Sequence, residues 1–255
     1  MTGSVATLHP DTGEGERTAR IELAAAFRVA HHLGWNLTAR NHITARIPDD
    51  PDHFLMNPLG AGWHEVTASS LLKVNVDGTV VTETDKAPGP AGLNFHSCIL
   101  RSKPELACSL HIHQEAGVIV SATEGGLRFY DQSACALYGE VAYHEFEGLA
   151  EDDEEGPRIV ADLEDNHALI MKNHGLLTVG RTIGEAFAYM QRLVTACELQ
   201  TRLLALNAKP RELAAEIARH TYDQMAARRG NKPFGGQDWQ MYLRLADSLD
   251  PQFRD

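Results

Sequence analysis

The second half of the chain contains the pattern that most constrains the fold: two strands, a tight turn and a capped helix. Two apolar segments, 168–171 and 176–179, flank the turn 172–175. Thr182 and Glu185 fit a capping box, in which both side chains satisfy free N–H groups at the start of a helix. Apolar residues then recur at helical spacing and predict a core-facing stripe: Ile183, Phe187, Met190, Val194 and Cys197. The helix needs a sheet to cover, so this pattern favours an α/β fold.

The remainder of the chain alternates strands and helices without an internal repeat. The predicted strands are 42–47, 54–57, 71–76, 79–82, 106–113 and 140–146, with Asp77-Gly78 as a tight turn within a hairpin. The predicted helices are 16–33, 93–102, 115–123, 211–228 and 237–248. The acidic run 151–155 is interpreted as a solvated loop. We expect a flexible lead-in over 1–16 and one domain over 17–255, with helices on both faces of a central mixed sheet in three α/β/α layers.

Composition narrows the classes of partner and the cell compartment. The 255 residues carry a formal net charge of −12, and a surface of that sign repels phosphate backbones and anionic lipid. We therefore expect neither nucleic acid nor a membrane as partner. No apolar segment approaches the roughly 20 residues of a transmembrane helix, and the polar N-terminus does not resemble a signal peptide. The four cysteines are scattered and predict buried free thiols in a reducing cytoplasm.

The histidines predict a metal site. His111 and His113 lie two residues apart in a predicted strand, so both imidazoles point to the same face and can reach one ion. His174 lies in the 172–175 turn, where Gly175 is expected to adopt a positive φ that lets the histidine project inward. Three nitrogens from one strand and one turn would leave coordination positions open for water and substrate, as catalytic metal sites require.

The same segments resemble the class II aldolase/adducin family. The resemblance rests on FHSCILRSKPELACSLHIHQEAGVIVSA, GEVAYHEFEGL and ALIMKNHGLLTVGRTIGEAFAYMQRLVTACELQ, and the last two are especially similar to the adducin head domain. Roughly residues 20–250 are covered. The resemblance implies a class II aldolase-like α/β/α fold and one divalent ion (Zn, Mn or Fe(II)) on His111, His113 and His174. It also implies a homotetramer with active sites between subunits.

Two features depart from the sugar-phosphate aldolases of that family. When the chain is aligned on Phe95-His96, Gly92 occupies the place of the catalytic glutamate. At the positions of the phosphate-binding Gly-Asn and Ser pairs stand Asn41-His42 and Pro90-Ala91. The sequence therefore predicts a non-phosphorylated small-molecule substrate and a site without the usual acid, unless a distant carboxylate such as Glu115 or Asp131 folds into the gap.

Three functions remain open from the sequence. The first is a metal-dependent lyase that cleaves a carbon–carbon bond, by retro-aldol reaction or decarboxylation, in a hydroxy acid, oxo acid or aromatic compound. Its proton-transfer candidates are His42, Tyr130 and Gln132, and its candidate substrate-binding residues are Asn41, His64 and Gly92. The second is a three-histidine Fe(II) oxygenase, because the NHIT and DHFLMNP segments resemble oxygenases of aminocoumarin pathways in the same family. The third is a non-catalytic adducin-like scaffold. His96 and His144 are interpreted as packed, hydrogen-bonded residues.

Overall fold

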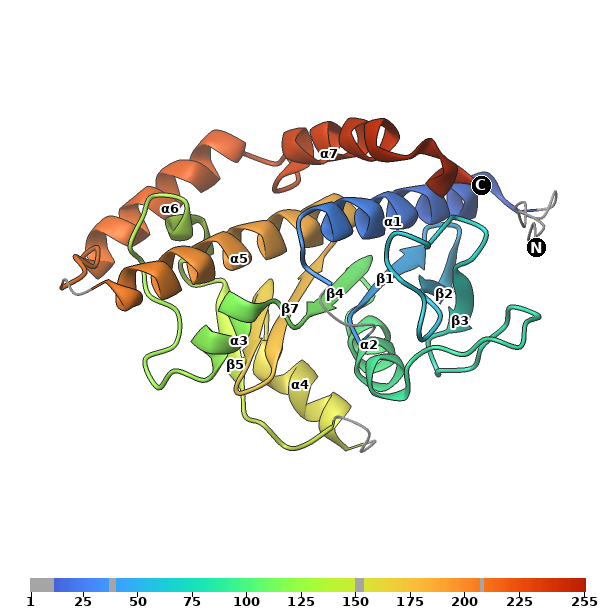
Figure 1. Cartoon of the computed structure of the whole chain (residues 1–255), viewed down its shortest axis with the longest axis horizontal. Coiled ribbons are helices and arrows are strands. Elements are labelled where there is room, and N and C mark those ends of the chain that lie inside the picture. The colour runs from blue at the N-terminus through green and yellow to red at the C-terminus, as the bar shows by residue number, and fades with distance from the viewer. Residues whose placement is uncertain (1–11, 37–39, 150–153, 207–208) are drawn as a thin grey trace.

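A seven-stranded mixed sheet forms the centre of the computed structural model, which describes residues 12–36, 40–149, 154–206 and 209–255 (Figure 1). Its strand order is β3-β2-β1-β4-β7-β6-β5, and only β5 and β6 run parallel. The strands are β1 (His42–Ile47), β2 (Asp50–Met56), β3 (Leu72–Asn75), β4 (Cys108–Ile112), β5 (Val141–His144), β6 (Ala168–Met171) and β7 (Gly175–Gly180). A mixed sheet with covering helices confirms the predicted fold class.

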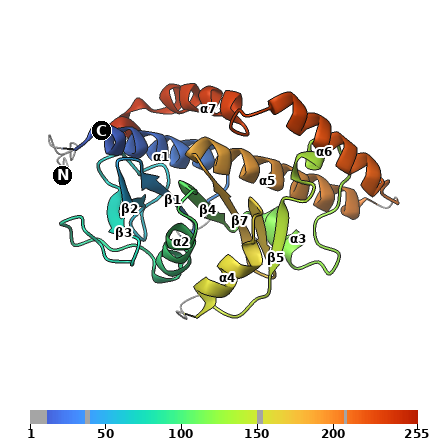
Figure 2. The same cartoon turned by 180° about the vertical axis from the view of Figure 1, so that it is seen from behind.

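Helices cover the two faces of the sheet unequally (Figures 1 and 2). The long helices α1 (Glu14–His32) and α5 (Ile183–Ala205) cover one face, with α7 (Gly236–Leu249) lying over α1 and α5. The shorter helices α2 (Pro90–Ser102) and α4 (Glu155–Leu163) cover the other. The remaining helices are α3 (Glu115–Ser121), α6 (Ala215–Arg229) and two 3-10 turns, η1 (Ala134–Leu137) and η2 (Pro251–Arg254).

Alternation along the strands produces two separate apolar cores. In β4, Leu110 and Ile112 point into the core beneath α1 and α5. In β7, Leu177 and Val179 point into the core beneath α2 and α4. Because successive side chains of a strand point to opposite faces, His111 in β4 faces away from Leu110 and Ile112, toward the α2 side. The antiparallel register then sets His111 of β4 directly opposite His42 of β1.

The turn between β6 and β7 differs from prediction in one detail. The residue with positive φ is Asn173 (φ 56°), which adopts the left-handed conformation that asparagine tolerates, and Gly175 is the first residue of β7. Glycine is required there for a different reason: a Cβ at Gly175 would lie 2.6 Å from the carbonyl oxygen of Ile112 in the neighbouring strand. Gly175 thus lets β7 approach β4, and the histidines come together as a result.

The capped helix forms as expected, with one change in its partners. The hydroxyl of Thr182 accepts a hydrogen bond from the N–H of Glu185 at 3.0 Å. The carboxylate of Glu185 accepts from the N–H of Arg181 at 2.7 Å, one residue before the cap. All five predicted stripe residues of this helix are buried. The four cysteines are also buried and unbridged, as predicted.

Other boundaries shift. Helix α1 begins at Glu14, inside the predicted lead-in, whose residues 1–11 lie outside the described residues. The second arm of the predicted hairpin is reduced to a single bridge between Val80 and Val74. Helix α4 was not predicted: its first residue, Glu155, belonged to the presumed acidic loop, of which residues 151–153 lie outside the described part. Glu155 is buried and lies 3.6 Å from the His144 imidazole. Within the described residues, no helix is long and apolar enough to cross a membrane.

Candidate metal centre and its pocket

Three imidazoles converge where β4 ends and β7 begins. The ring centroids of His111, His113 and His174 lie 4.6, 4.9 and 4.9 Å apart in pairs. One ring nitrogen from each lies within 4.8 Å of the others. The Nε2 atoms of His111 and His113 are 3.2 Å apart. Two metal–nitrogen bonds of about 2.1 Å meeting at about 100° would give the same separation, so the donor set fits a divalent ion.

Asn41 fixes the orientation of one candidate ligand. Its Oδ1 accepts from both the backbone N–H and the Nδ1–H of His113, at 2.8 and 2.9 Å. An amide oxygen only accepts, so Nδ1 of His113 carries the proton and Nε2 presents its lone pair to the centre. Outer-shell acceptors of this kind set the tautomer of metal-binding histidines. From the sequence we expected Asn41 to bind the substrate. In the structure its side-chain oxygen accepts hydrogen bonds from His113.

The histidines around the centre are held neutral. Burial lowers the pKa of His174 to about 4, and the positive charges of neighbouring histidines add to the effect. The pKa of His111 is lowered well below the usual value by burial first and by the other histidines second. Burial also lowers the pKa of His113, with a contribution from the charge of Arg40. Neutral imidazoles keep the lone pairs that a metal needs.

A buried chain of hydrogen bonds fixes a fourth histidine, His42. The Thr44 hydroxyl donates to the carbonyl of Ser109 at 3.2 Å, so its oxygen can only accept from Nδ1 of His96, 3.4 Å away. Nε2 of His96 is then the acceptor for Nδ1–H of His42, at 2.8 Å. His42 is left with a lone pair on Nε2. Burial lowers the pKa of His42 to about 3, followed by the charges of His113 and His174, so its ring is neutral at pH 7.

Gly92 and His42 complement each other in size. A Cβ on Gly92 would lie 2.6 Å from both Cδ2 and Nε2 of the His42 ring. The His42 ring also stacks on His111, with centroids 5.1 Å apart. The imidazole thus fills the space beside Gly92, the position where the resemblance places a glutamate. A larger residue at 92 requires His42 to move.

The centre opens into a pocket of about 590 Å³. The N-terminus of α2 forms one wall, where the first N–H groups of a helix have no intrahelical acceptor and favour negative charge. Asn57, which is 4% exposed, lines the same pocket, and its Oδ1 has no hydrogen-bond partner among the described residues. Phe146 and Leu149 line it too and are 55% and 73% exposed. The pocket therefore combines a polar floor with exposed apolar side chains.

The structure brings together some of the predicted site residues and separates others. The residues lining this pocket include Asn41, His42, Gly92 and the three candidate ligands. His64 is not among them; it is exposed, and its ring lies 4.8 Å from that of His31. Tyr130 does not line the pocket of its own chain, and Gln132 lines a different hollow.

Neither distant carboxylate fills the gap left by glycine at position 92. The Asp131 carboxylate accepts from the N–H groups of Ser133 and Ala134, and Glu115 is exposed at the start of α3. The histidine cluster contains no carboxylate among the described residues. Sequence reasoning missed two residues here, Asn57 and the linking role of His96. Asn57 could have been found from the sequence, because it is a polar residue at the end of a strand before Pro58. No local pattern indicates that His96 links Thr44 to His42.

Comparisons with known proteins show the family to which this fold belongs. The profile of the Class II Aldolase and Adducin N-terminal domain matches residues 21–201. Alpha-adducin of Rattus norvegicus is 38% identical over 249 residues, covering 92% of this chain; the chain spans only about a third (34%) of the adducin. The aldolase II superfamily protein from Pseudomonas syringae is 36% identical with a TM-score of 0.90, over 96% of this chain and 98% of its own. The L-fuculose 1-phosphate aldolase from Glaciozyma antarctica is 29% identical with a TM-score of 0.84, over 98% of both chains. The profile match spans well over half of the sequence, and this chain therefore belongs to the class II aldolase and adducin family.

Proposed function

We propose that this protein is a metal-dependent lyase that cleaves a carbon–carbon bond in a non-phosphorylated hydroxy or oxo acid. The observation that carries the proposal is the geometry of His111, His113 and His174, three neutral imidazoles at the head of an open pocket. A scaffold needs no such opening. A divalent ion held there supplies Lewis acidity, which polarises a carbonyl group and lowers the cost of carbanion formation beside it.

His42 is the proposed proton acceptor. Its Nε2 lone pair is fixed by His96 and Thr44, and it is the only one of the three proton-transfer candidates that lines this pocket in its own chain. A proton taken up at Nε2 would leave Nδ1–H bonded to His96, so the ring need not rotate. Tyr130 and Gln132 retain a role only if a neighbouring copy presents them to this pocket, as in the homotetramer we propose.

The anionic group of the substrate is proposed to bind at the start of α2. Pro90 has no N–H, so Ala91 and Gly92 are the first residues able to donate there. One carboxylate can satisfy these two donors, and Arg40 at the rim of the pocket attracts the same charge. Asn57 Oδ1 is placed to accept from a substrate hydroxyl, since it has no described partner. Phe146 and Leu149 suit an apolar or aromatic remainder.

One specific observation favours a second function. The histidine cluster contains no carboxylate among the described residues, which suits Fe(II) with open positions for two further ligands. An oxidative cleavage of the same class of substrate is therefore the alternative. Protein loaded with Fe(II) would then consume O₂ with substrate, whereas a lyase would act under nitrogen with Zn or Mn.

A substrate panel tests the proposal. Protein loaded with Zn, Mn or Fe(II) is incubated with hydroxy acids, oxo acids, aromatic hydroxy acids and sugar phosphates, and the products are followed by NMR. We expect cleavage of an acid and no preference for phosphorylated sugars. His42→Asn should lower kcat about 10²–10⁴-fold, as loss of a proton-transfer group does, while metal content stays unchanged. His220→Asn, an exposed histidine of α6, is the matched control. A clear preference for a sugar phosphate, or full activity of His42→Asn, contradicts the proposal.

A further inference from the structure

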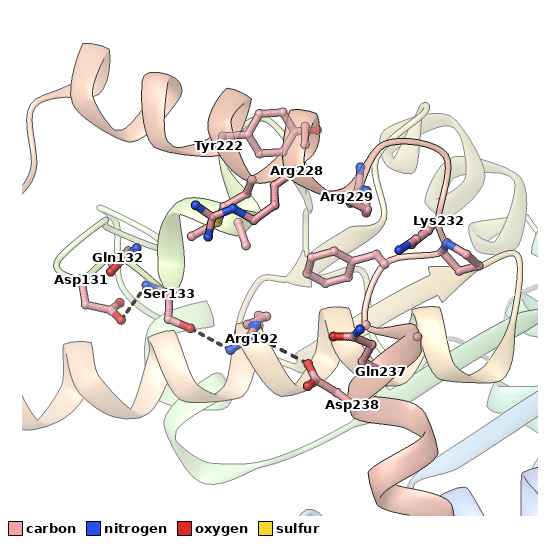
Figure 3. A pocket seen from close by; sticks show the side chains of 17 residues that line it. Asp131, Gln132, Ser133, Arg192, Tyr222, Arg228, Arg229, Lys232, Gln237 and Asp238 are labelled. Atoms are coloured by element: carbon pink, nitrogen blue, oxygen red, sulfur yellow. Dashed lines mark hydrogen bonds and ion pairs between the residues drawn. The ribbon is translucent and has the colours of Figure 1, made fainter.

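A second hollow, larger than the histidine pocket, lies between the C-terminal helices and the rest of the fold. It encloses about 900 Å³ and is lined by the η1 region, by Arg192 of α5, by the end of α6 and by the turn into α7 (Figure 3). None of its lining residues lines the histidine pocket. Most of them follow residue 201, where the match to the family profile ends. Helices that follow the matched region thus supply most of this hollow, and η1 and α5 of the matched region supply the rest.

Positive charge gathers around this hollow in a chain whose net charge is −12. Four basic side chains line it: Arg192, Arg228, Arg229 and Lys232. Among the described residues, no carboxylate oxygen lies within 4.0 Å of the cationic groups of the last three. Like charges repel one another, so such a grouping favours an anion that sits between them.

The two acids of the hollow are already engaged. Both oxygens of Asp131 accept backbone N–H groups at the start of η1, at 2.9 and 3.1 Å. Asp238 lies 3.5 Å from Arg192, which also donates to the Ser133 hydroxyl at 3.1 Å (Figure 3). These contacts hold Arg192 toward the hollow. They leave Arg228 and Lys232 to set the charge that a ligand meets, since the charge of Arg229 also acts on the buried Glu140 carboxyl and helps to lower its pKa.

A flat apolar surface adjoins these cations. The Phe234 ring stacks on Tyr189, with centroids 4.4 Å apart and planes 26° apart. The guanidinium carbon of Arg229 lies 5.4 Å from the centre of the Phe234 ring. Met225 and Pro233 extend the apolar surface. A ligand that pairs an anionic group with a flat ring would satisfy both halves of this hollow.

The turn that carries this surface is fixed by close packing. Gly235 adopts φ 68°, and a Cβ there would lie 2.1 Å from the Cβ of Ala188 in α5. A Cβ on Gly184 would likewise lie 2.4 Å from the Trp239 ring. The turn into α7 therefore packs closely against α5 because both contacts are made by glycines. This packing fixes the position of the Phe234 ring beside the cations.

From these observations we propose that the C-terminal hollow binds a small organic phosphate that carries a flat ring, of the nucleotide class. Arg228 and Lys232 contact the phosphates, and Phe234 contacts the ring. Within one chain the two pockets share no lining residue, so this ligand is distinct from a substrate held at the histidines of the same chain. Ligand binding is measured without any cleavage reaction, so this proposal can fail while the proposed lyase activity holds, and the reverse.

Calorimetric titration of the full chain with ADP and with pyrophosphate tests the proposal. We expect saturable ADP binding that weakens as salt is raised, and weaker binding of pyrophosphate, which lacks the ring. The double variant Arg228→Gln/Lys232→Gln should weaken ADP binding at least about tenfold, as the loss of charge-assisted hydrogen bonds predicts. The matched control is Lys209→Gln/Arg211→Gln, which removes the same charge from exposed positions outside the hollow and should bind ADP normally.

Five results would overturn the proposal. Wild-type protein that does not bind ADP at millimolar concentration has no such site. Equal weakening in both double variants means that the overall charge of the protein is responsible, and undiminished binding in Arg228→Gln/Lys232→Gln places the ligand elsewhere. Equal affinity for ADP and pyrophosphate removes the assigned ring contact. Sedimentation of both variants is measured in parallel, and a change of oligomeric state confined to Arg228→Gln/Lys232→Gln would show that the hollow is an interface between copies.

Discussion

The two walls of the histidine pocket are built in different ways. On the β4–β7 wall, His111, His113 and His174 come from one strand and one adjacent turn, and strand geometry alone brings them together. On the β1–α2 wall, His42 and Gly92 lie 50 residues apart in the chain. The His42 ring fills the space that a side chain at Gly92 would need, and a hydrogen bond from His42 to His96 fixes that ring. The first wall would hold an ion by its donor set. The second would decide which chemistry takes place beside it, so substitutions on the two walls should have separable effects.

The largest expected effect concerns the β4–β7 wall. His113→Ala should remove nearly all bound metal, because two imidazoles alone form a weak site for a divalent ion and the third is lost. Metal content is measured by elemental analysis after dialysis against a trace of the ion. His53→Ala, a histidine of β2 outside the pocket, should retain one equivalent. Stoichiometric metal in His113→Ala would show that this histidine is not a ligand.

The β1–α2 wall should respond in stability instead. Gly92→Ala places a Cβ 2.6 Å from the His42 ring, and overpacking of this kind costs about 1–3 kcal/mol. For a chain of this length that corresponds to a fall in Tm of roughly 2–12 °C. Gly236→Ala, where a Cβ meets nothing within 4 Å, is the control.

A double variant isolates the packing between these two residues. Adding His42→Ala to Gly92→Ala should recover part of the lost Tm, because the smaller side chain frees the space that the new Cβ needs. If the fall in Tm of the double variant equals the sum of the two single-variant falls, the side chains at 42 and 92 do not pack against each other. For the same reason, Gly92→Glu alone should not create aldolase activity: a glutamate cannot enter the site while His42 occupies it.

A smaller effect is expected from Asn41, which links the two walls. Asn41→Ala removes the acceptor that fixes Nε2 of His113 toward the centre. Loss of such an acceptor weakens metal affinity about 10–100-fold, and metal should still bind at saturation. Competition with a chromogenic chelator measures the change. Unaltered affinity would mean that the tautomer of His113 is set by something else.

The last effect, which is absent at neutral pH, is a pH dependence of the metal-free protein. The pKa values of His42 and His174 are about 3 and about 4 in the fold, against 6.5 in the unfolded chain. The unfolded chain therefore takes up these protons first as the pH falls. The free energy of unfolding should decline between pH 6.5 and 4 and remain level with respect to these groups above pH 7. Urea unfolding at a series of pH values measures it. His42→Asn should flatten the decline, and a wild-type curve that is level from pH 7 to 5 would contradict the assignment.

Local patterns predicted the fold more completely than the site. Strand alternation, the Thr182 cap and the resemblance indicated the sheet, the helix that follows it and the three clustered histidines. Helix α4 escaped prediction because Glu155 looked like part of a solvated acidic run, although it is buried beside His144. Gly175 was expected to adopt a positive φ. Glycine is needed there for another reason, because a Cβ would clash with the Ile112 carbonyl oxygen of the neighbouring strand, and no local pattern in the sequence records that contact.

The roles of polar residues in the pocket depend on long-range contacts. Asn41 was expected to bind the substrate; it lines the pocket, and its Oδ1 accepts a hydrogen bond from His113, 72 residues away. His96 was interpreted as a packed, hydrogen-bonded residue. It is buried, and its hydrogen bond to His42 sets the tautomer of that histidine, a role that the sequence did not indicate. His64 was expected to bind the substrate, but Trp63 before it is buried and the His64 side chain is exposed outside the pocket. Hydrogen bonds between distant strands and helices decide these roles.

A crystal structure of metal-loaded protein with anomalous diffraction data tests the central claim most directly. The account predicts one ion per chain, bound by a nitrogen of each of His111, His113 and His174 at about 2.0–2.2 Å, with no protein carboxylate in its coordination sphere. Nε2 of His42 should face the open positions without binding the ion. A carboxylate oxygen within about 2.2 Å of the ion, or an ion bound elsewhere with these three histidines free, would contradict the claim.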